Sequence, residues 1–352
     1  MTNDVENIFG RRLNQARLIK GLTMDELGKR VQPAVTRQAI NKYEKGNTSP
    51  DSRMLIAFSA ALGVKPDYFF RPFTVAVDKI MFNKKAGVLE RVIASIREKV
   101  REELERYLEI EELCGSSAVF TLYKKEVCTA DEAREYANEV RIKFGLGFDG
   151  ISNVIEVLED NGIKIIEISE DESFGGLSGY ANDSIPVIVV NRNLTSEEKR
   201  FTLLHELGHL IMDCPSESES KKIEHLCNTF ASEMLMPSSV LKGRLGNMRH
   251  DISLAELSDI QRQYGVSIDT IMLSLKDLGV ITGRRYDGYL KKKKLFPDFN
   301  AIVGKSLFVS ETSGRFVRMV YRAIADEIIS LSKAASLLNT SVDRVRSQLQ
   351  LV

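Results

Sequence analysis

The amino-acid sequence predicts an α+β protein that is predominantly α-helical, with an all-α N-terminal domain, a small β-sheet near the middle and a helical C-terminal region. Helix-capping residues precede several amphipathic segments, as Thr23, Thr36, Thr129 and Thr195 do. Residues 163–190, by contrast, hold three short strand-like runs, two of them rich in isoleucine and valine. A chain of 352 residues, 43% hydrophobic and 28% charged, is long enough for two or three globular domains.

We expect four segments along the chain. Residues 1–73 form the helical N-terminal domain, residues 74–128 a helical linker, residues 129–283 the domain that contains the sheet, and residues 284–352 the C-terminal helical region. No apolar run reaches the roughly eighteen residues of a membrane span, and the N-terminus lacks an apolar signal segment. We therefore expect no membrane contact and a cytoplasmic location.

The four cysteines stand far apart, without CxxC spacing. They are Cys114, Cys128, Cys214 and Cys227. This spacing argues against a disulfide framework and against a cysteine zinc cluster, so we expect most of the four to be buried thiols.

The N-terminal domain is basic. Residues 1–73 carry twelve Lys and Arg residues against seven acidic ones, which suits a polyanionic partner. We expect helices at 9–20, 23–31, 37–44 and 51–62. The third is rich in Arg, Gln, Asn and Lys, and two short helices with a tight connection match the helix-turn-helix geometry, in which the second helix enters the major groove of DNA.

This domain resembles the Cro/repressor-like (XRE) helix-turn-helix family in residues 22–28, residues 38–46 and Pro50. The resemblance implies operator DNA as a partner. The residues it implies for DNA binding are Thr36, Arg37, Gln38, Asn41 and Lys42. Gln38 would read a base edge, because glutamine can pair with adenine in a bidentate way, whereas Lys42 would mainly set affinity and its salt dependence. The alternative is a domain that keeps this fold but docks protein.

A long helical seam is expected in residues 84–113, which contain no proline. Apolar residues recur there at spacings of three and four. They are Leu89, Ile93, Ile96, Val100, Leu104, Tyr107 and Leu108. The seam can pair with its copy in a homodimer, which the two-fold half-sites read by helix-turn-helix proteins favour, or it can pack back on the peptidase core. The sequence does not distinguish between these two arrangements of the seam.

The middle of the chain predicts two helices and then a small sheet. We expect helices from Thr129 to Gly145 and from Val154 to the turn at Asn161, then strands at 163–168, 177–181 and 185–190. An exposed edge strand can hold an extended peptide by backbone hydrogen bonds. Residues 178–181 and 187–191 are the two candidates for such an edge.

The pentapeptide His205-Glu206-Leu207-Gly208-His209 has the spacing of a zinc hydrolase. Residues at i and i+4 share one helix face, so both imidazoles can reach the same ion, with Glu206 beside it to handle a proton. The whole chain has four histidines, and three of them lie in this region: His205, His209 and His225. Gly208 would let another part of the chain pass close by.

A catalytic zinc needs three protein ligands and an open fourth position, and two histidines with a downstream carboxylate form a common set. Residues 221–236 are expected to be helical, with Glu224 and Asn228 on one face and Glu233 on the opposite side. Only one of the two glutamates can face the ion. Zn²⁺ is the expected metal, and Mn²⁺ suits similar ligands.

Residues 201–210 and 228–237 resemble the ImmA/IrrE family of bacterial metallopeptidases, as do residues 137–165 and 187–191. The resemblance implies a zincin-like peptidase domain in residues 129–283. In that family a glutamate just ahead of an Asn-x-Phe-Ala segment is the third ligand, which implies His205, His209 and Glu224 as the metal ligands. This sequence departs from the commonest pattern, Glu-Ala-Asn, in having Leu226-Cys227-Asn228.

The expected chemistry is metal-assisted peptide hydrolysis. Zn²⁺ lowers the pKa of a coordinated water toward about 7 and polarises the scissile carbonyl, while Glu206, the expected catalytic residue, takes the proton and passes it to the leaving amine. Tyr180 and His250 are candidate oxyanion donors by residue type alone. A strand tyrosine and a surface histidine are their structural alternatives.

The resemblance also implies a task. Family members typically cleave a repressor that carries an XRE-type domain, which relieves repression of stress or mobile-element genes. The alternative is a non-proteolytic DNA-binding regulator whose metal site is structural or sensing. A second alternative is an antitoxin-like partner protein.

The last third of the sequence predicts further helices. Residues 254–264 and 271–278 form a pair that lacks a basic face, and residues 316–349 are helical. We expect residues 284–294 to form a basic loop, because Arg284, Arg285 and Lys291 to Lys294 cluster there. No function is assigned to this region.

Overall fold

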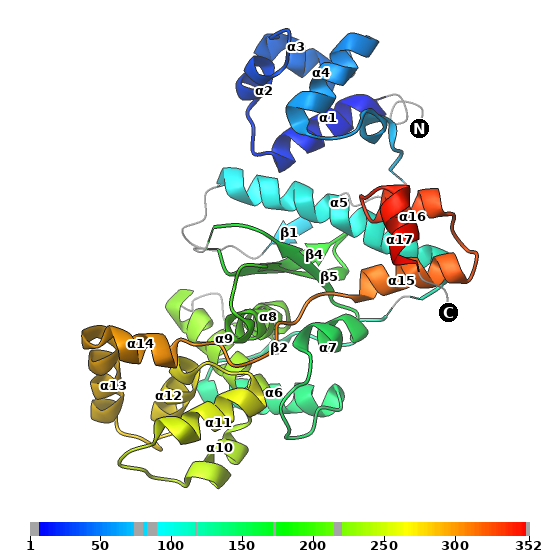
Figure 1. Ribbon diagram of the computed structural model, residues 1–352. Helices are drawn as coiled ribbons and strands as arrows, with labels where there is room; N and C mark the ends of the chain where they lie inside the picture. Colours follow the sequence, from blue (N-terminus) through cyan, green and yellow to red (C-terminus); the bar gives the residue numbers. More distant parts are fainter. Residues whose placement is uncertain are drawn as a thin grey trace. The chain divides into compact units, whose positions relative to one another are not determined.

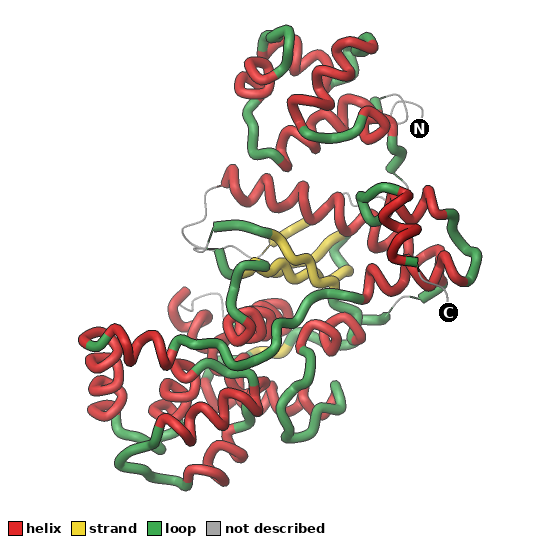
Figure 2. Tube along the Cα trace, viewed as in Figure 1, coloured by secondary structure: helices red, strands yellow, loops and turns green. Residues whose placement is uncertain are grey.

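The computed structural model describes residues 7–73, 80–82, 90–116, 118–171, 174–214 and 220–349. Within them the protein is predominantly α-helical, with a four-stranded and a two-stranded sheet (Figures 1 and 2), so the predicted fold class is confirmed. The chain forms two compact units. One comprises Met1–Ile80, Lys84–Ser116 and Met319–Val352, and the other Met81–Asn83 and Ser117–Arg318.

Across these described ranges, no helix is both long and apolar enough to cross a membrane.

The first unit begins with a small helical domain. Its elements are α1 (Ile8–Ile19), α2 (Met24–Arg30), α3 (Arg37–Glu44), α4 (Ser52–Leu62) and the 3-10 helix η1 (Pro66–Phe70). Thr23, Thr36 and Asp51 cap α2, α3 and α4, so the four predicted helices are confirmed. A Cβ atom on Gly28 would lie 2.3 Å from the carbonyl oxygen of Val35. Only glycine therefore allows the turn before α3 to lie this close to α2.

The predicted seam forms α5 (Glu90–Cys114), which contacts α1 and α16 (Leu331–Leu337). Ile96, Val100 and Leu104 are fully buried in the folded chain. The Arg12 guanidinium contacts the Glu105 carboxylate at 3.1 Å, in a buried ion pair that joins α1 to α5. These seam residues are thus covered within one chain, and Leu89 lies outside the described residues.

The last helices of the described chain agree with the prediction that residues 316–349 are helical. They are α15 (Arg315–Ala325), α16 and α17 (Val342–Gln348), of which α16 and α17 lie wholly in the first unit. Arg106 on α5 donates from Nη1 to the carbonyl of Leu337, 3.0 Å away, which helps to fix α16 on α5.

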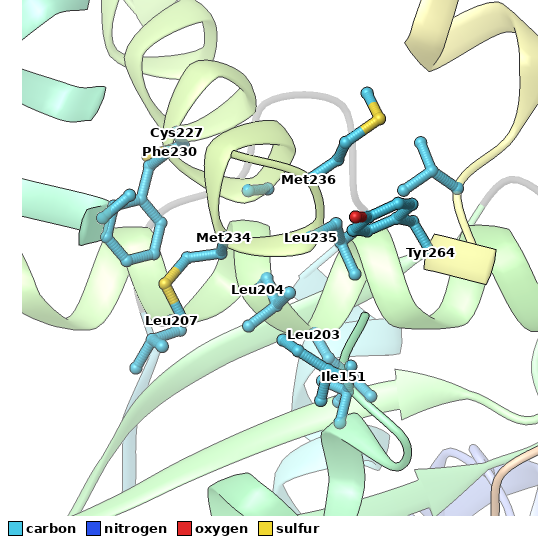
Figure 3. Packing of buried hydrophobic residues seen from close by; sticks show 14 of the residues in the cluster. Ile151, Leu203, Leu204, Leu207, Cys227, Phe230, Met234, Leu235, Met236 and Tyr264 are labelled. Carbon is cyan, nitrogen blue, oxygen red and sulfur yellow. The ribbon is translucent and has the colours of Figure 1, made fainter. Parts of the chain in front are cut away.

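The second unit surrounds a large hydrophobic core. Its helices are α6 (Ala130–Lys143), α7 (Val154–Asp160), α8 (Ser196–Ile211), α9 (Ser220–Leu235), α10 (Ser238–Leu245), α11 (Leu254–Tyr264), α12 (Ile268–Asp277), α13 (Gly283–Leu295) and α14 (Pro297–Val303). Leu204 and Leu207 of α8 pack with Phe230 and Leu235 of α9 in this core (Figure 3). A Cβ atom on Gly208 would lie 3.5 Å from the Cα of Cys227, so the expected close approach at Gly208 is that of α9.

The four-stranded sheet has the order β1-β4-β5-β3. Its strands are β1 (Ile80–Phe82), β3 (Lys164–Ile168), β4 (Gly176–Ala181) and β5 (Ile185–Asn191). β3 pairs parallel to β5, and β4 pairs antiparallel to β5 through a turn in which Asn182 and Asp183 have φ angles of 49° and 60°. Asparagine and aspartate tolerate this left-handed conformation best among non-glycine residues.

The positions of β4 and β5 correct two predictions. Neither residues 178–181 nor residues 187–191 are at an edge, because β4 lies between β1 and β5, and β5 lies between β4 and β3. A second, two-stranded parallel sheet joins β2 (Lys125–Glu126) to β6 (Met212–Asp213), directly after α8.

The predicted basic loop at 284–294 is also wrong, since these residues lie in α13. Thr282 caps this helix, and arginine, lysine and leucine all favour helical conformation. Asp269 on α12 accepts a hydrogen bond from Tyr289 at 2.7 Å and pairs with Lys293, so part of the basic cluster is tied back to the fold.

The segment after α14 packs on the N-terminal half of α8 through buried polar groups. Arg200 on α8 forms a buried ion pair with Glu311, and Glu311 also accepts from the backbone N–H of Val154 at 2.9 Å. Lys199 pairs with Glu167 of β3 at 2.8 Å. These contacts fix α8 against α7 and β3, and therefore fix the start of the helix that carries the histidines.

All four cysteines are free thiols. Cys227 alone among them is fully buried, and the other three are half-buried. The expectation that most would be buried is therefore wrong.

Candidate metal centre and nucleic-acid interface

His205 and His209 lie one turn apart on α8 and face Glu224 on α9. The Nε2 atom of His205 lies 3.2 Å from Glu224 Oε2, and the Nε2 atom of His209 lies 3.5 Å from Glu224 Oε1. The two Nε2 atoms are 3.1 Å apart. These three residues form the group in the described ranges whose ligand atoms, all within 4.8 Å of one another, could hold a metal ion.

The spacing of these atoms fits a metal ion. Zinc binds nitrogen and oxygen ligands at about 2.0–2.2 Å, and tetrahedral angles then separate neighbouring ligand atoms by about 3.3–3.6 Å. The distances of 3.1 to 3.5 Å between His205, His209 and Glu224 lie near this range. Glu224 is the most exposed of the three, so the group is open toward solvent on the side of α9.

The surroundings of His205 orient its ring toward Glu224. Its Nδ1 atom lies 2.9 Å from Oδ1 of Asn228, and because an amide oxygen only accepts, Nδ1 carries the proton. The Asn228 contact leaves Nε2 of His205 facing the Glu224 carboxylate. This second hydrogen bond on a ligating histidine is usual around protein metal sites.

The electrostatics of Glu224 agree with a ligand role. Hydrogen bonds at His205 and His209 hold the pKa of Glu224 well below its usual range, so its carboxyl group is ionised at neutral pH. Cys227 adds a further contact, with its Sγ atom 3.5 Å from Nδ1 of His209. Both histidines are therefore contacted at Nδ1 by α9 and turned with Nε2 toward Glu224.

Glu206 is held between α8 and β4. Its side chain is 3% exposed, and its Oε2 atom accepts a hydrogen bond of 2.8 Å from the hydroxyl of Ser178. A Cβ atom on Gly176 would lie 2.6 Å from Cγ2 of Thr202 and 3.3 Å from Cγ of Glu206. Glycine at this position thus allows β4 to lie directly against the part of α8 that carries Glu206.

Glu233, the other candidate ligand, has a different place. It is buried and accepts from Asn138 at 2.9 Å and from the backbone N–H of Ser238 at 3.1 Å. It therefore joins α6 to the start of α10. The structure brings Glu224, and not Glu233, together with the two histidines.

The two candidate oxyanion donors are not part of this group. The hydroxyl of Tyr180 donates to the carbonyl of Leu210 at 3.1 Å, and burial raises its pKa. His250 is exposed in the segment between α10 and α11. Sequence reasoning missed Ser178 as a partner of Glu206, because 28 positions separate them and no local spacing links them.

A cavity of about 280 Å³ lies beside the metal group. It is lined by Asn228, which contacts His205, and by Phe201, His225, Met236, Leu273 and Tyr286, among others. Its wall is mixed, with apolar side chains from α8, α10, α12 and α13 next to hydroxyl and carboxylate groups.

The candidate DNA-binding residues lie on α3 and its cap. Arg37, Gln38 and Lys42 are exposed, Asn41 is half-buried, and the Thr36 hydroxyl accepts from the backbone N–H of Ala39 at 3.2 Å.

Buried contacts hold the inner face of α3. Ile40 is fully buried in the core, and Glu44 forms a buried ion pair with Arg17 of α1 at 2.6 Å. The helix is thus fixed from one side, and its polar side chains are exposed on the other.

Comparison with known proteins finds matches to two stretches of the chain. Residues 158–276 match the family model described as IrrE N-terminal-like domain, and residues 13–69 match the model described as helix-turn-helix. The radiation response metalloprotease IrrE of Deinococcus deserti is 29% identical over 26% of this chain and 36% of its own length.

Two further relatives are similar to this chain over shorter shares of it. The uncharacterized HTH-type transcriptional regulator y4aM of Sinorhizobium fredii is 38% identical over 19% of this chain and 46% of its own length. The SPbeta prophage-derived uncharacterized HTH-type transcriptional regulator YonR of Bacillus subtilis is 34% identical over 18% and 57%. The chain thus spans between 36% and 57% of the length of these curated relatives.

Separate stretches of this one chain are thus similar to a helix-turn-helix model and to the IrrE N-terminal-like model. The helix-turn-helix match includes α3, and the IrrE-like match includes α8 and α9, which carry His205, His209 and Glu224.

Proposed function

We propose that this protein is a zinc-dependent endopeptidase fused to a DNA-binding domain, and that it cleaves an XRE-type transcriptional repressor to derepress stress or mobile-element genes. The observation that carries the proposal is the convergence of His205, His209 and Glu224 beside the buried carboxyl group of Glu206. The similarity to a radiation response metalloprotease supports the peptidase part. Mn²⁺ is the alternative metal, because it suits similar ligands.

The residues of the site would have separate roles in metal binding, proton transfer and positioning. His205, His209 and Glu224 would hold the ion, which when bound supplies Lewis acidity toward a carbonyl oxygen and a water molecule. Glu206 takes the proton of the attacking water and delivers it to the leaving amine. The Ser178 hydroxyl holds one oxygen of Glu206, so that the carboxylate keeps its position when it gains and loses the proton.

A peptide substrate would lie along β4. This strand carries Ser178 and contacts α8 at Gly176, so a peptide that paired with it in place of β1 would pass close to Glu206. Main-chain hydrogen bonds would hold the peptide, and the 280 Å³ cavity beside Asn228 is a place for one of its side chains.

The DNA-binding part of the proposal rests on α3. Its exposed Arg37, Gln38 and Lys42 would face the operator. Such a domain would bring the peptidase to the DNA where an XRE-type repressor is bound, which raises the local concentration of the substrate. The proposed location is the cytoplasm.

The test uses the metal-loaded protein with an XRE-type repressor encoded beside it. Mass spectrometry of the products should show defined fragments with wild type, and Glu206→Gln should reduce the rate at least about 100-fold, since general base catalysis contributes about that much. Metal content should stay unchanged in Glu206→Gln and fall in His205→Ala. Glu198→Gln is the matched control, because Glu198 is an exposed capping-box residue of the same helix and glutamine also serves that box.

The fragments observed distinguish a peptidase from a non-proteolytic regulator. Fragments that appear with wild type and Glu198→Gln but not with Glu206→Gln establish the peptidase. Intact repressor in every sample with metal bound, single-stranded DNA included as a stress mimic, would instead favour a non-proteolytic DNA-binding regulator with a structural or sensing metal site.

A further inference from the structure

β4 is paired along both of its edges. In the four-stranded sheet its neighbours are β5 on one side and β1 on the other (Figure 1). β1 consists of Ile80–Phe82, and Met81 and Phe82 belong to the same compact unit as β4. A segment that lies in the sequence between the helix-turn-helix domain and α5 is therefore part of the sheet of the candidate peptidase.

The edge of β4 that β1 occupies is the one an extended substrate would need. The other edge pairs with β5 over all six residues of β4, from Gly176↔Val190 to Ala181↔Ile185. An incoming peptide can form backbone hydrogen bonds only with an edge that is not already paired. Ser178 of β4 contacts Glu206, so the strand with which β1 pairs carries a partner of the catalytic carboxyl group.

We propose that β1 is an intramolecular competitor for the peptide-binding edge of β4, so that a substrate from outside the chain binds only when β1 has left. The inference rests on the proposed peptidase function and adds the regulation of its site. The occupant is the chain's own segment Ile80–Phe82.

The binding free energy of β1 is expected to be small enough for its pairing with β4 to be reversible. A covalently attached segment acts at an effective concentration in the millimolar range for a short connection, which outcompetes a peptide present at micromolar concentration. Three residues form only a few backbone hydrogen bonds, each of which contributes about 0.5–1.5 kcal/mol net. Binding of a long partner along all of β4 can therefore displace β1 without unfolding the sheet.

Proline substitutions in β1 test the proposal in the full-length protein. Met81→Pro and Phe82→Pro each remove one backbone N–H, and in a strand neighbouring N–H groups point to opposite sides, so one of the two variants loses a bond to β4. Met81→Val is the matched control, because it keeps the N–H group and favours the strand.

The first readout does not depend on catalysis. Hydrogen exchange at the backbone amides of β4 should be faster in one proline variant than in wild type, while Met81→Val stays like wild type. A fluorescent peptide with the sequence of residues 77–85 should bind that proline variant more tightly than wild type by about tenfold or more. Equal peptide affinity in all four proteins would overturn the proposal.

The second readout is cleavage of the XRE-type repressor. The proline variant with the exposed edge should cleave it about tenfold faster than wild type and Met81→Val. An unchanged rate despite faster exchange in β4 would contradict the proposal, as would a cut in the chain's own residues 77–85, because β1 would then be a substrate. Absence of cleavage in every variant, together with tighter peptide binding to the proline variant, would reject the peptidase and leave β1 as the occupant of the edge.

Discussion

Glu159 is a buried carboxyl group whose ionisation the fold opposes. Its side chain lies on α7 and is 2% exposed; one oxygen accepts from Ser313 at 2.6 Å, and the other has no hydrogen-bond partner within the described ranges. Burial raises the pKa of Glu159 from 4.5 to about 7. The folded state therefore binds more protons than the unfolded state between these two values, and the free energy of unfolding falls as the pH rises through this window.

Glu159→Gln removes this dependence, because the amide is neutral at every pH and its oxygen can still accept from Ser313. We expect the variant to exceed wild type in stability at pH 8 by on the order of 1–3 kcal/mol, and to match it near pH 4.5. Urea denaturation at the two pH values measures the difference. A stability gap of the same size at both would show that ionisation of Glu159 is not its cause.

At the scale of an element, α3 is expected to act as the recognition helix. Its inner face is held by Ile40 and by the ion pair between Glu44 and Arg17, so substitutions on its outer face should leave the fold intact. Lys42→Ala should weaken binding to operator DNA uniformly across sequences and reduce the slope of log affinity against log salt by about one. Gln38→Ala should cost about 1–3 kcal/mol and relax the preference at one base pair.

Fluorescence anisotropy with labelled operator DNA at several salt concentrations measures both effects. Lys65→Ala is the matched control, since Lys65 is an exposed lysine of the same domain that lies outside α3. If Lys42→Ala and Lys65→Ala give the same salt slope as wild type, the exposed face of α3 does not contact phosphates, and a protein partner becomes the better assignment.

At the scale of the whole molecule, we expect metal to stabilise only one of the two compact units. The core that includes Leu204, Leu207 and Phe230 lies beside the candidate metal group, whereas Leu13, Ile40 and Phe58 form the separate core of the helix-turn-helix domain. A ligand stabilises only the structure that binds it. We therefore expect two thermal transitions, of which Zn²⁺ raises one.

Differential scanning calorimetry measures this effect. A free zinc concentration a hundred times the dissociation constant contributes about 2.7 kcal/mol, which corresponds to about 5–10 °C for a unit of this size. His205→Ala should abolish the shift, and a chelator should reverse it in wild type. Zinc-dependent shifts of equal size in both transitions, or a shift that persists in His205→Ala, would speak against the site.

Local physics determined much of this protein from the sequence alone. Helices begin where Thr23, Thr129 and Thr195 place a hydroxyl ahead of a glutamate three residues on, since this capping box satisfies backbone groups within a single turn. The spacing of His205 and His209 put two imidazoles on one face for the same reason: helix geometry needs only neighbours in sequence. The basic stretch at 284–294 was predicted wrongly, because charge alone does not distinguish a loop from a helix such as α13.

Only the tertiary structure decided which distant groups meet. Glu224 and Glu233 lie on opposite sides of α9, and the face turned toward α8 depends on how Phe230 and Leu235 pack in the core. The same holds for Ser178 beside Glu206, for the burial of the α5 seam within one chain, and for β1 on the edge of β4. Each of these contacts joins residues far apart in sequence, and packing and sheet register, which no local pattern encodes, select the partners.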